Sequence, residues 1–286
     1  MIMTKPAVYQ VSDWSGSSGD RWASNQRRLD AMLEVFGEAA IAAADPRAGE
    51  HVLDIGCGAG ASSFLLANRV GADGRVLGLD ISPQLIERAR ELGEGAVDFA
   101  LDDAATAELA VQAYDLLFSR FGVMFFADPA AAFTHMRAAL KTGGRLAFVC
   151  WRGAAENDWV RLPMGAIRDI LPPPPAPDPE ASGPFSFGDA ARVERLLVEA
   201  GFTGIAIAPF DAEIPFGEGP SREAAIDDAV QMAFEVGPLS RALADQDETV
   251  RARCASAVHA AFAARPGERS VMIDGAAWIV TARNPG

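Results

Sequence analysis

The chain has 286 residues and a formal net charge of −14, from 39 acidic residues against 25 Lys and Arg. This balance argues against a protein that binds the nucleic-acid backbone, because such proteins need a basic surface. Half of the residues are hydrophobic, with sixteen Phe and five Trp, which suffices for a sizeable core in one large domain or a domain with a cap.

Cysteine usage and hydropathy indicate the cellular compartment in which the protein is expected. Cys57, Cys150 and Cys254 are far apart and fit neither a disulfide framework nor the C-x-x-C spacing of a metal site. The first residues contain no apolar segment of the secretory kind, and no apolar run approaches the ~20 residues of a membrane span. We therefore expect a soluble, cytoplasmic protein without a membrane span.

The N-terminal part begins with a polar, turn-rich stretch of twenty residues, in which we predict no regular structure. Trp14 and Trp22 are large apolar groups in this polar setting. Either they pack the segment onto the core or they cover a ligand site, and both interpretations stay open. From residue 24 to residue 44 apolar residues recur at helical spacing, with Leu29, Met32, Leu33 and Phe36 on one face, which predicts a helix.

The stretch HVLDIGCGAGASS, residues 51–63, is the most informative one in the chain. A short apolar strand is followed at once by a glycine turn and then by a helix over residues 61–70. Strand, glycine turn and helix open a nucleotide-binding βαβ unit, in which a ligand lies against bare backbone. The residues of the turn that we expect at the ligand are Gly56, Cys57, Gly58 and Gly60.

The ligand of this turn is not decided by the glycines, since G-x-G-x-x-A is also a dinucleotide fingerprint. Asp54 is more informative, because a carboxylate there would repel a pyrophosphate by roughly 1–4 kcal/mol near 4 Å. A ligand with an ammonium and a sulfonium would be attracted instead. A tight turn without any ligand is the remaining interpretation.

Strands and helices then alternate, which predicts a mostly parallel sheet covered on both faces. Predicted strands cover residues 75–79, 97–101, 114–118 and 145–151, and predicted helices cover 83–92 and 129–140. Farther on, helices are expected over 158–171, 187–200 and 221–264, and strands over 205–214 and 270–282. The last two strands predict a hairpin that encloses a helical insertion. The proline-rich residues 172–179 are expected to form a loop within a cap.

Acidic residues end three successive strands, at Asp54, Asp80 and Asp102-Asp103. Carboxyl ends of parallel strands share one edge, where ligands bind. Asp80 lies about twenty residues beyond the glycine turn, the place of an acceptor for a ribose diol, and each such hydrogen bond is worth about 1.5–3 kcal/mol. Asp103 could accept from an exocyclic amine and the Ala104 amide could donate to an adenine nitrogen, with Ile81 against the ring. For any single acid, a solvated turn is an equal alternative.

In its combination of motifs the chain resembles the class I S-adenosylmethionine-dependent methyltransferases, close to the ubiquinone/menaquinone methyltransferase-like group. The resemblance rests on VLDIGCGAG at 52–60, GLDISP at 78–83, DDA at 102–104, YDLLFSRFGVMFF at 114–126 and LKTGGRLAFVCW at 140–151. It implies an α/β fold with a Rossmann-like seven-stranded sheet, mostly parallel with an antiparallel last strand, plus helical cap insertions. It also implies S-adenosylmethionine as the cofactor and S-adenosylhomocysteine as the product.

Residue roles follow from the same resemblance. The methionine end of the cofactor would lie at Asp54, Gly56 and Gly58, and its nucleoside at Asp80, Ile81, Asp103 and Ala104. Ser119 would lie beside the methionine part and Arg120 near the methyl group. The domains expected are an N-terminal segment and helix covering the cofactor site (1–48), the cofactor-binding core (49–152), a helical substrate cap (153–270) and the last core strand (271–286).

The chemistry expected is methyl transfer to a small, partly hydrophobic acceptor by in-line displacement. Positioning alone can contribute about 7–11 kcal/mol, so a dedicated base is optional. The weak catalytic candidates are His259 and Arg120, and the candidates for the acceptor site are Trp14, Trp22, Trp151, Arg152, Asn157 and Trp159. For each of these, packing is at least as good an explanation.

The sequence also bears on metal use and on the class of activity. No cluster of ligand residues has metal-binding spacing, so we expect metal-independent transfer by a monomer or homodimer. Two alternatives remain open. The first is an NAD(P)-dependent oxidoreductase, favoured by G-x-G-x-x-A and Asp80 and opposed by Asp54 and Asp103. The second is a non-catalytic S-adenosylmethionine-binding protein.

Overall fold

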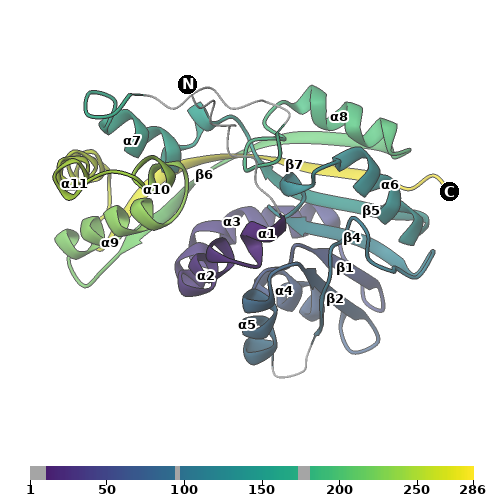
Figure 1. The fold of residues 1–286 in the computed structure, drawn as a ribbon. Helices are drawn as coiled ribbons and strands as arrows, with labels where there is room; N and C mark the ends of the chain where they lie inside the picture. The colour runs from purple at the N-terminus through teal and green to yellow at the C-terminus, as the bar shows by residue number, and fades with distance from the viewer. Residues whose placement is uncertain (1–10, 94–96, 173–180) are drawn as a thin grey trace.

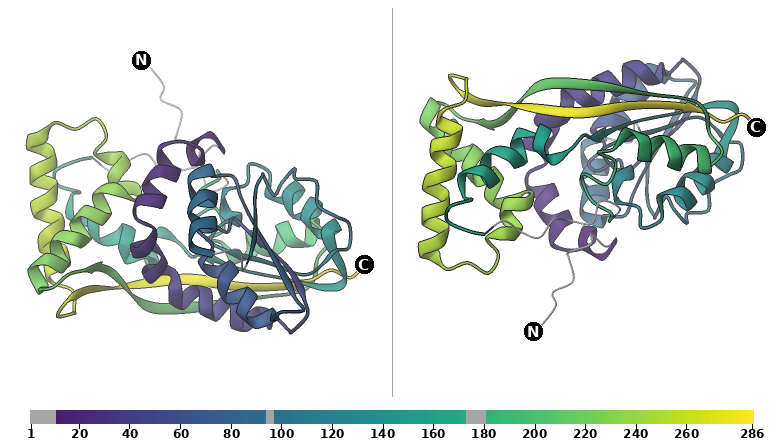
Figure 2. Two further views of the ribbon diagram at one scale, coloured as in Figure 1. Left: turned by 90° about the horizontal axis from the view of Figure 1, so that it is seen from below. Right: turned by 90° about the horizontal axis from the view of Figure 1, so that it is seen from above.

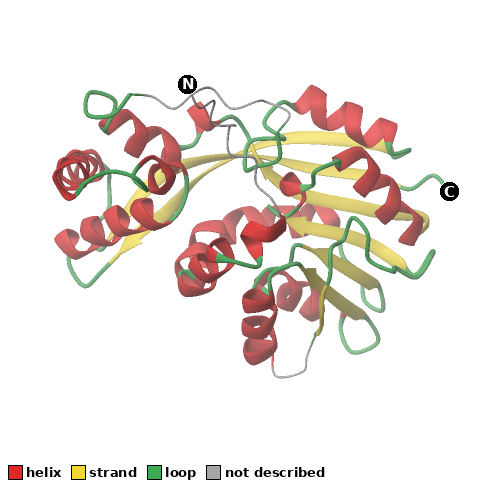
Figure 3. Ribbon diagram, in the orientation of Figure 1, coloured by secondary structure: helices red, strands yellow, loops and turns green. Residues whose placement is uncertain are grey.

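The computed structural model of the protein describes residues 11–93, 97–172 and 181–286, and in these residues seven strands form one sheet (Figure 1, Figure 3). The strands are β1 (His51–Ile55), β2 (Arg75–Asp80), β3 (Asp98–Leu101), β4 (Tyr114–Arg120), β5 (Leu140–Trp151), β6 (Thr203–Glu218) and β7 (Ser270–Arg283). The helices before β5 are α1 (Val11–Trp14), α2 (Ser17–Ser24), α3 (Gln26–Ala44), α4 (Ala61–Val70), α5 (Pro83–Gly93), the 3₁₀ turn η1 (Val123–Phe125) and α6 (Pro129–Ala139). Those after β5 are the 3₁₀ turn η2 (Ala154–Glu156), α7 (Asp158–Ala166), α8 (Ala190–Glu199), α9 (Arg222–Glu235), α10 (Pro238–Ala242) and α11 (Glu248–Ala263).

The strand order in the sheet is β3-β2-β1-β4-β5-β7-β6. Neighbouring strands from β3 to β5 are parallel, whereas β7 runs antiparallel to both β5 and β6. The predicted Rossmann-like sheet with an antiparallel last strand is therefore confirmed. The carboxyl ends of β1 to β4 share one edge, which is the edge that carries the predicted acids.

The hairpin of β6 and β7 extends well beyond the sheet. Its strands pair from Thr203–Arg283 to Glu218–Ser270, whereas pairing between β5 and β7 stops at Trp151–Ala277. The hairpin thus projects past the carboxyl end of β5 and carries α9, α10 and α11 at its tip (Figure 1, Figure 2). Together with α7, which packs against α10 and α11, these helices form the cap. The domain boundaries at residues 48, 152 and 270 stay predictions.

Helix α3 packs across β5, β6 and β7, and α6 and α8 pack together against the opposite face (Figure 2). The predicted apolar face of α3 is confirmed, since Leu29, Met32, Leu33 and Phe36 are all buried. Phe36 meets the rings of Phe121, Trp151 and Phe210 edge to face, at centroid distances of 5.1–5.8 Å. This helix thus leads from the middle of the sheet to the base of the cap.

The prediction of no regular structure before residue 20 is wrong for residues 11–20, where α1 and α2 form. The polar composition hides two short helices that are held by tryptophan packing and by one close contact. A Cβ on Gly19 would lie 2.6 Å from Ser82 Oγ, so α2 docks directly on the start of α5. The predicted proline-rich loop lies largely in residues 173–180, outside the described residues. Among the helices that are described, none combines the length and the apolar character needed to cross a membrane.

Candidate functional site

The loop after β1 is held in a conformation that suits glycine. Gly56, Gly58 and Gly60 have φ values of 63°, 56° and 88°, in the left-handed region where a Cβ is disfavoured. A Cβ on Gly56 would lie 2.8 Å from the Cα of Gly122, so the loop touches the segment after β4. A Cβ on Gly58 would meet no atom within 4 Å, so bare backbone faces open space there. Cys57 is buried inside the turn, and burial raises the pKa of its thiol.

Asp54 is fully buried at the end of β1. Its Oδ2 accepts hydrogen bonds from Ser62 Oγ at 2.7 Å and Ser63 Oγ at 2.6 Å, both in the first turn of α4. Its Oδ1 has no partner in the described part of the chain. Burial raises the pKa of Asp54 to about 6, although both hydroxyls and the charge of Arg120 act in the other direction. A buried carboxylate oxygen without a donor is costly, and a cationic ligand group would relieve that cost.

Asp80 ties the glycine loop to the end of β2. Its Oδ2 accepts from the Gly58 N–H at 2.8 Å, and its Oδ1 accepts from the Ser82 N–H at 2.9 Å. Burial raises the pKa of this carboxyl group as well. Each carboxylate oxygen can accept a further hydrogen bond. The side chain can therefore hold the loop and still receive two hydroxyl groups of a ligand.

The segment after β3 continues the same edge. The Asp102 N–H donates to the Asp80 carbonyl at 3.1 Å, which joins this segment to the end of β2. Asp103 Oδ1 accepts from the Ala105 N–H at 2.9 Å, and Ala104 is buried. Ile81, half-buried, follows Asp80 directly. The structure thus brings the predicted nucleoside residues together.

The end of β4 joins the glycine loop to α3. Ser119 Oγ donates to the Ile55 carbonyl at 2.7 Å and accepts from the Gly122 N–H at 3.1 Å, so it fixes the two strand ends side by side. Arg120, predicted near the methyl group, directs its guanidinium to α3, where Nη2 lies 2.6 Å from Asp30 Oδ1. Both side chains of this ion pair are largely buried. Arg120 is thus engaged in anchoring α3.

A largely apolar pocket of about 90 Å³ adjoins this edge, between α1–α3, the end of β4 and the cap. Four of the predicted acceptor-site residues line it, namely Trp14, Trp22, Trp151 and Trp159. Trp14 and Trp22 therefore pack together and also line a pocket, and their role in covering a ligand site stays a prediction. Their rings pack edge to face at 5.5 Å, and the same rings form part of a pocket wall.

Phe121 is one of the pocket-lining residues that the sequence predictions missed. It lines the pocket, stacks on Trp151 with ring centroids 4.2 Å apart, and has a left-handed φ of 60°. Such a backbone conformation is strained in a residue with a Cβ and is found preferentially at functional sites. Met124 and Phe125 line the pocket beside it. The apolar run after Arg120 was the available signal.

Comparison with known proteins agrees with this geometry. Residues 46–160 match the family model described as "Methyltransferase domain". Aklanonic acid methyltransferase DauC from Streptomyces sp. (strain C5) is 35% identical over 148 residues, which cover 50% of this chain and 64% of that protein. Nocamycin O-methyltransferase from Saccharothrix syringae is 30% identical over 197 residues, which cover 64% of this chain and 68% of that protein. The chain belongs to the class I S-adenosylmethionine-dependent methyltransferases.

A solved structure supports the fold of this methyltransferase. Haemonchus contortus phosphoethanolamine N-methyltransferase 2 superposes with a TM-score of 0.58 at 16% identity, over 99% of this chain and 62% of that chain. The matches span between half and about two thirds of the length of the first curated relatives. Membership of the ubiquinone/menaquinone methyltransferase-like group stays a prediction.

S-adenosylmethionine is the cofactor of this family, and the edge of the sheet fits it. The orphaned Asp54 Oδ1 suits an ammonium group, and the remaining lone pairs of Asp80 suit a ribose diol. The bare backbone at Gly58 leaves room for the chain of the methionine part.

Arg152 and Asn157, predicted at the acceptor site, are absent from the described residues that line the pocket of this methyltransferase. Arg152 forms ion pairs with Glu156 and with Asp211, the latter at 2.7 Å, and lies over the ring of Trp278. Asn157 is fully buried. Its amide donates to the carbonyls of Gly153 and Ala276 at 3.1 Å, and its Oδ1 accepts from the Ala276 N–H at 3.0 Å.

Replacing Asn157 by alanine is expected to destabilise the methyltransferase by about 1–3 kcal/mol, because the N–H of the buried Ala276 would lose its acceptor and the carbonyls of Gly153 and Ala276 would each lose one of their donors. Urea denaturation followed by circular dichroism measures the free energy of unfolding. An unchanged stability together with a raised KM for the acceptor would instead indicate a role in acceptor binding.

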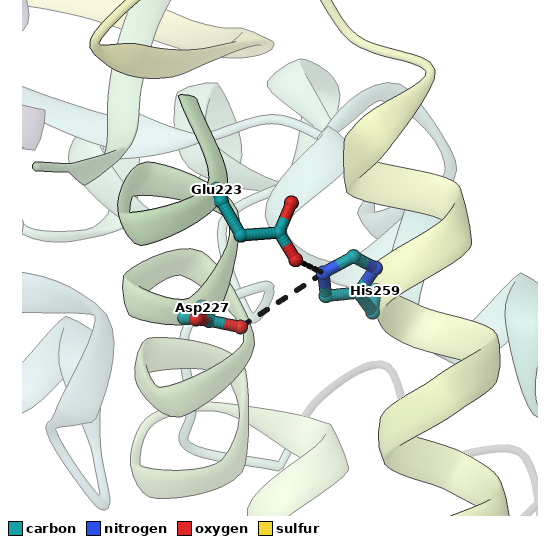
Figure 4. A group of neighbouring side chains, drawn as sticks. All are labelled: Glu223, Asp227 and His259. Atoms are coloured by element: carbon teal, nitrogen blue, oxygen red, sulfur yellow. Dashed lines mark hydrogen bonds and ion pairs between the residues drawn. The ribbon is translucent and has the colours of Figure 1, made fainter. Parts of the chain in front are cut away.

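His259, a weak catalytic candidate, lies on α11 facing α9 (Figure 4). Its Nε2 lies 3.2 Å from Glu223 Oε1 and 3.8 Å from Asp227 Oδ1, and both carboxylate side chains are about 70% exposed. Ligand atoms of the three residues lie within 4.8 Å of one another, a grouping that the sequence analysis missed. None of the three belongs to the described lining of the pocket. The structure therefore places His259 outside the described lining of this pocket, and a catalytic role for it stays a prediction.

Proposed function

We propose that this methyltransferase moves the methyl group of S-adenosylmethionine to a small, partly hydrophobic acceptor bound in the tryptophan-lined pocket. One observation carries this proposal. Gly122, which touches the glycine loop at Gly56, directly follows Phe121, which lines the pocket. The edge that suits the cofactor and the pocket that suits an apolar acceptor therefore share one segment of chain, and two bound molecules would meet across it.

The proposed cofactor contacts use the groups that the edge leaves available. Asp54 and the backbone of Gly56 to Gly60 would hold the methionine end, with Cys57 filling the turn and Ser119 fixing the strand end beside it. Asp80 would accept the ribose hydroxyls, and Ile81, Asp103 and Ala104 would surround the adenine. Arg120 would act on this site by anchoring α3 through Asp30.

The protein would contribute to the reaction by positioning the two reactants and by excluding water from them. S-adenosylmethionine supplies a methyl group that is already activated on a sulfonium. The rings of Phe121, Trp151 and Trp159 would fix the plane of an acceptor, and Trp14 and Trp22 would cover it against water. Alignment of two reactants in this way can contribute about 7–11 kcal/mol without a dedicated base. Direct in-line displacement therefore suits the residues at the pocket.

The acceptor atom is proposed to be oxygen. One relative is named an O-methyltransferase and another acts on an acid, according to their names. A cytoplasmic location and a monomeric or homodimeric state stay predictions.

Ligand binding and turnover test the proposal together. S-adenosylhomocysteine at 1 mM should raise the melting temperature by several degrees, whereas NAD⁺ and NADP⁺ should not. Hydroxy- and carboxynaphthalenes incubated with methyl-deuterated S-adenosylmethionine should then yield products carrying the label, detected by mass spectrometry. Stabilisation by NAD(P)⁺ alone would favour an oxidoreductase. Binding of S-adenosylhomocysteine without binding or methylation of any naphthalene probe would favour a non-catalytic binding protein.

Removal of metal ions is expected to leave the transfer rate unchanged. The metal-ligand group found in the described residues, Glu223, Asp227 and His259, lies outside the pocket lining. Turnover should be equal before and after dialysis against EDTA. A loss of activity that zinc or magnesium restores would contradict metal-independent transfer.

A further inference from the structure

The polar side chains of the pocket are not equally engaged. Glu235 Oε2 accepts from Asn25 Nδ2 at 2.9 Å, and its Oε1 accepts from Gln231 Nε2 at 2.8 Å. Arg28 lies within 4.0 Å of the same carboxylate, so the negative charge of Glu235 is compensated within the protein. Ser240 Oγ donates to the Gly237 carbonyl at 2.8 Å. These groups already have partners in the absence of a bound molecule.

Arg21 of α2 differs from them. Its guanidinium donates to Ser18 Oγ at 3.1 Å, and no carboxylate of the described residues forms an ion pair with it. Guanidinium has five N–H donors and no acceptor, so the hydrogen bond to Ser18 leaves further donors for a ligand or for solvent. Arg241 also lines the pocket, so two arginines border it in a protein with a net charge of −14.

Trp159 offers a second free donor. The residue lines the pocket with 8% of its surface exposed, and its indole Nε1 has no hydrogen-bond partner in the described residues. A buried N–H without a partner is unfavourable. The Nε1 atom itself is shielded, so an acceptor atom would reach it only if the ring moved. Arg21 is the donor open to a ligand, and it calls for an acceptor atom such as a carboxylate or phenolate oxygen rather than for a donor such as an amine.

The shape of the walls points to a flat molecule. Trp14 packs edge to face on Trp22 and on Phe125, at centroid distances of 5.5 and 5.0 Å. On the sheet side, Phe121 stacks on Trp151. Rings from two directions therefore border the pocket, and aromatic surfaces favour planar partners in stacked or edge-to-face contact.

We infer that the acceptor is a planar aromatic molecule with an anionic oxygen group, and that Arg21 holds this group. The inference rests on the proposed function, because it assigns the acceptor to the same pocket. Arg–carboxylate contacts are charge-assisted and can be bidentate, which fixes the orientation of the ring as well as its affinity. Arg21 is exposed, so solvent and salt screen the contact, and we expect a moderate preference for the anion, about tenfold.

Tryptophan fluorescence gives a direct test, because four of the five tryptophans line the pocket. The probes are 2-naphthoic acid, anionic at pH 7.5, and 2-naphthamide, its neutral analogue of the same shape. Both are titrated into the protein saturated with S-adenosylhomocysteine. We expect naphthoate to bind about tenfold more tightly than the amide at low salt, with a smaller ratio at 0.5 M NaCl.

Two substitutions sharpen the test. Arg21→Gln should abolish the preference for naphthoate and leave the affinity for the amide unchanged, whereas Arg21→Lys should restore part of it. Arg27→Gln is the matched control, since Arg27 is an exposed arginine at the start of α3 outside the pocket lining, and it should keep the full preference.

The outcomes separate this inference from the proposed function. Equal binding of both probes, or a preference that Arg21→Gln retains, would overturn the anionic subsite and leave the pocket as the acceptor site. Failure of both probes to bind in the presence of S-adenosylhomocysteine would overturn the aromatic acceptor and the assignment of the pocket together. Binding of S-adenosylhomocysteine itself, followed by calorimetry, would stand apart from either result.

Discussion

Replacing Asp80 by alanine is expected to weaken the binding of S-adenosylhomocysteine at least tenfold while the protein stays folded. The carboxylate is placed to accept two ribose hydroxyls, and hydrogen bonds to a charged group are worth about 1.5–3 kcal/mol each. The loss of one such bond already corresponds to about a tenfold change. Asp80 also accepts the N–H groups of Gly58 and Ser82, so the substitution loosens the glycine loop as well. Isothermal titration calorimetry measures the affinity.

The matched control for this substitution is Asp98→Ala. Asp98 is an exposed acid at the start of the neighbouring strand β3, at the opposite edge of the sheet, and its removal changes the net charge by the same amount. It should leave the affinity unchanged. A Tm within a few degrees of the wild type shows that Asp80→Ala is folded. An Asp80→Ala protein that binds S-adenosylhomocysteine like the wild type would remove Asp80 from the cofactor site.

The affinity for S-adenosylhomocysteine is expected to fall steeply below pH 6, by about tenfold for each pH unit. Burial raises the pKa of Asp54 to about 6, so the carboxyl group is neutral below this pH in the free protein. An ammonium group needs the charged form, and binding must then release a proton, which costs about 1.36 kcal/mol per pH unit. Above pH 6 the affinity should be independent of this group. Calorimetric titrations between pH 5 and pH 7.5 would measure the slope.

The stability of the free protein should change in the opposite direction over this range. The folded pKa of Asp54 lies above its usual value of 3.8, so the folded state retains a proton that the unfolded state releases. This stabilising contribution is fully present below about pH 4 and is lost as the pH rises through about 6.

The control for the pH dependence is Asp54→Asn. This variant should bind S-adenosylhomocysteine about ten- to a hundredfold more weakly at pH 7.5, in line with the loss of one charged hydrogen bond. Its affinity should show little pH dependence beyond the part that comes from Asp80, whose pKa burial also raises. A wild-type affinity that stays constant from pH 5 to pH 7.5 would place the ammonium group away from Asp54.

The gathering of the glycine turn and the strand-end acids at one edge of the sheet could be predicted from sequence, because each of these features is local. The strand at residues 51–55, the glycines and the acid that ends each strand follow one another within short stretches, and parallel pairing alone gathers them at one edge. The same reasoning predicted the antiparallel hairpin, since its two strands flank a visibly helical insertion.

The positions of the residues predicted for the acceptor site and for catalysis were less predictable, because contacts with residues distant in sequence decide where their side chains lie. Asn157 looks like a free polar residue after a strand, yet its partner Ala276 lies 119 residues away. Arg120 pairs with Asp30, which is 90 residues away in sequence, and His259 contacts Glu223, which is 36 residues away. In the segment after β4, the aromatic run was visible, but the left-handed turn that presents Phe121 to the pocket was not.

The hairpin of β6 and β7 bears on how a molecule could enter the proposed acceptor pocket. Its backbone ladder runs from the sheet to the base of the cap, between Thr203–Arg283 and Glu218–Ser270, with register irregularities only near its two ends. A hinge between core and cap would have to bend two strands that brace each other, and so would break several hydrogen bonds at once. The opposite wall is built from the two short helices α1 and α2, which no strand pairing joins to the sheet. We therefore expect acceptor and product to enter and leave on the side of α1 and α2, while the cap helices keep their position.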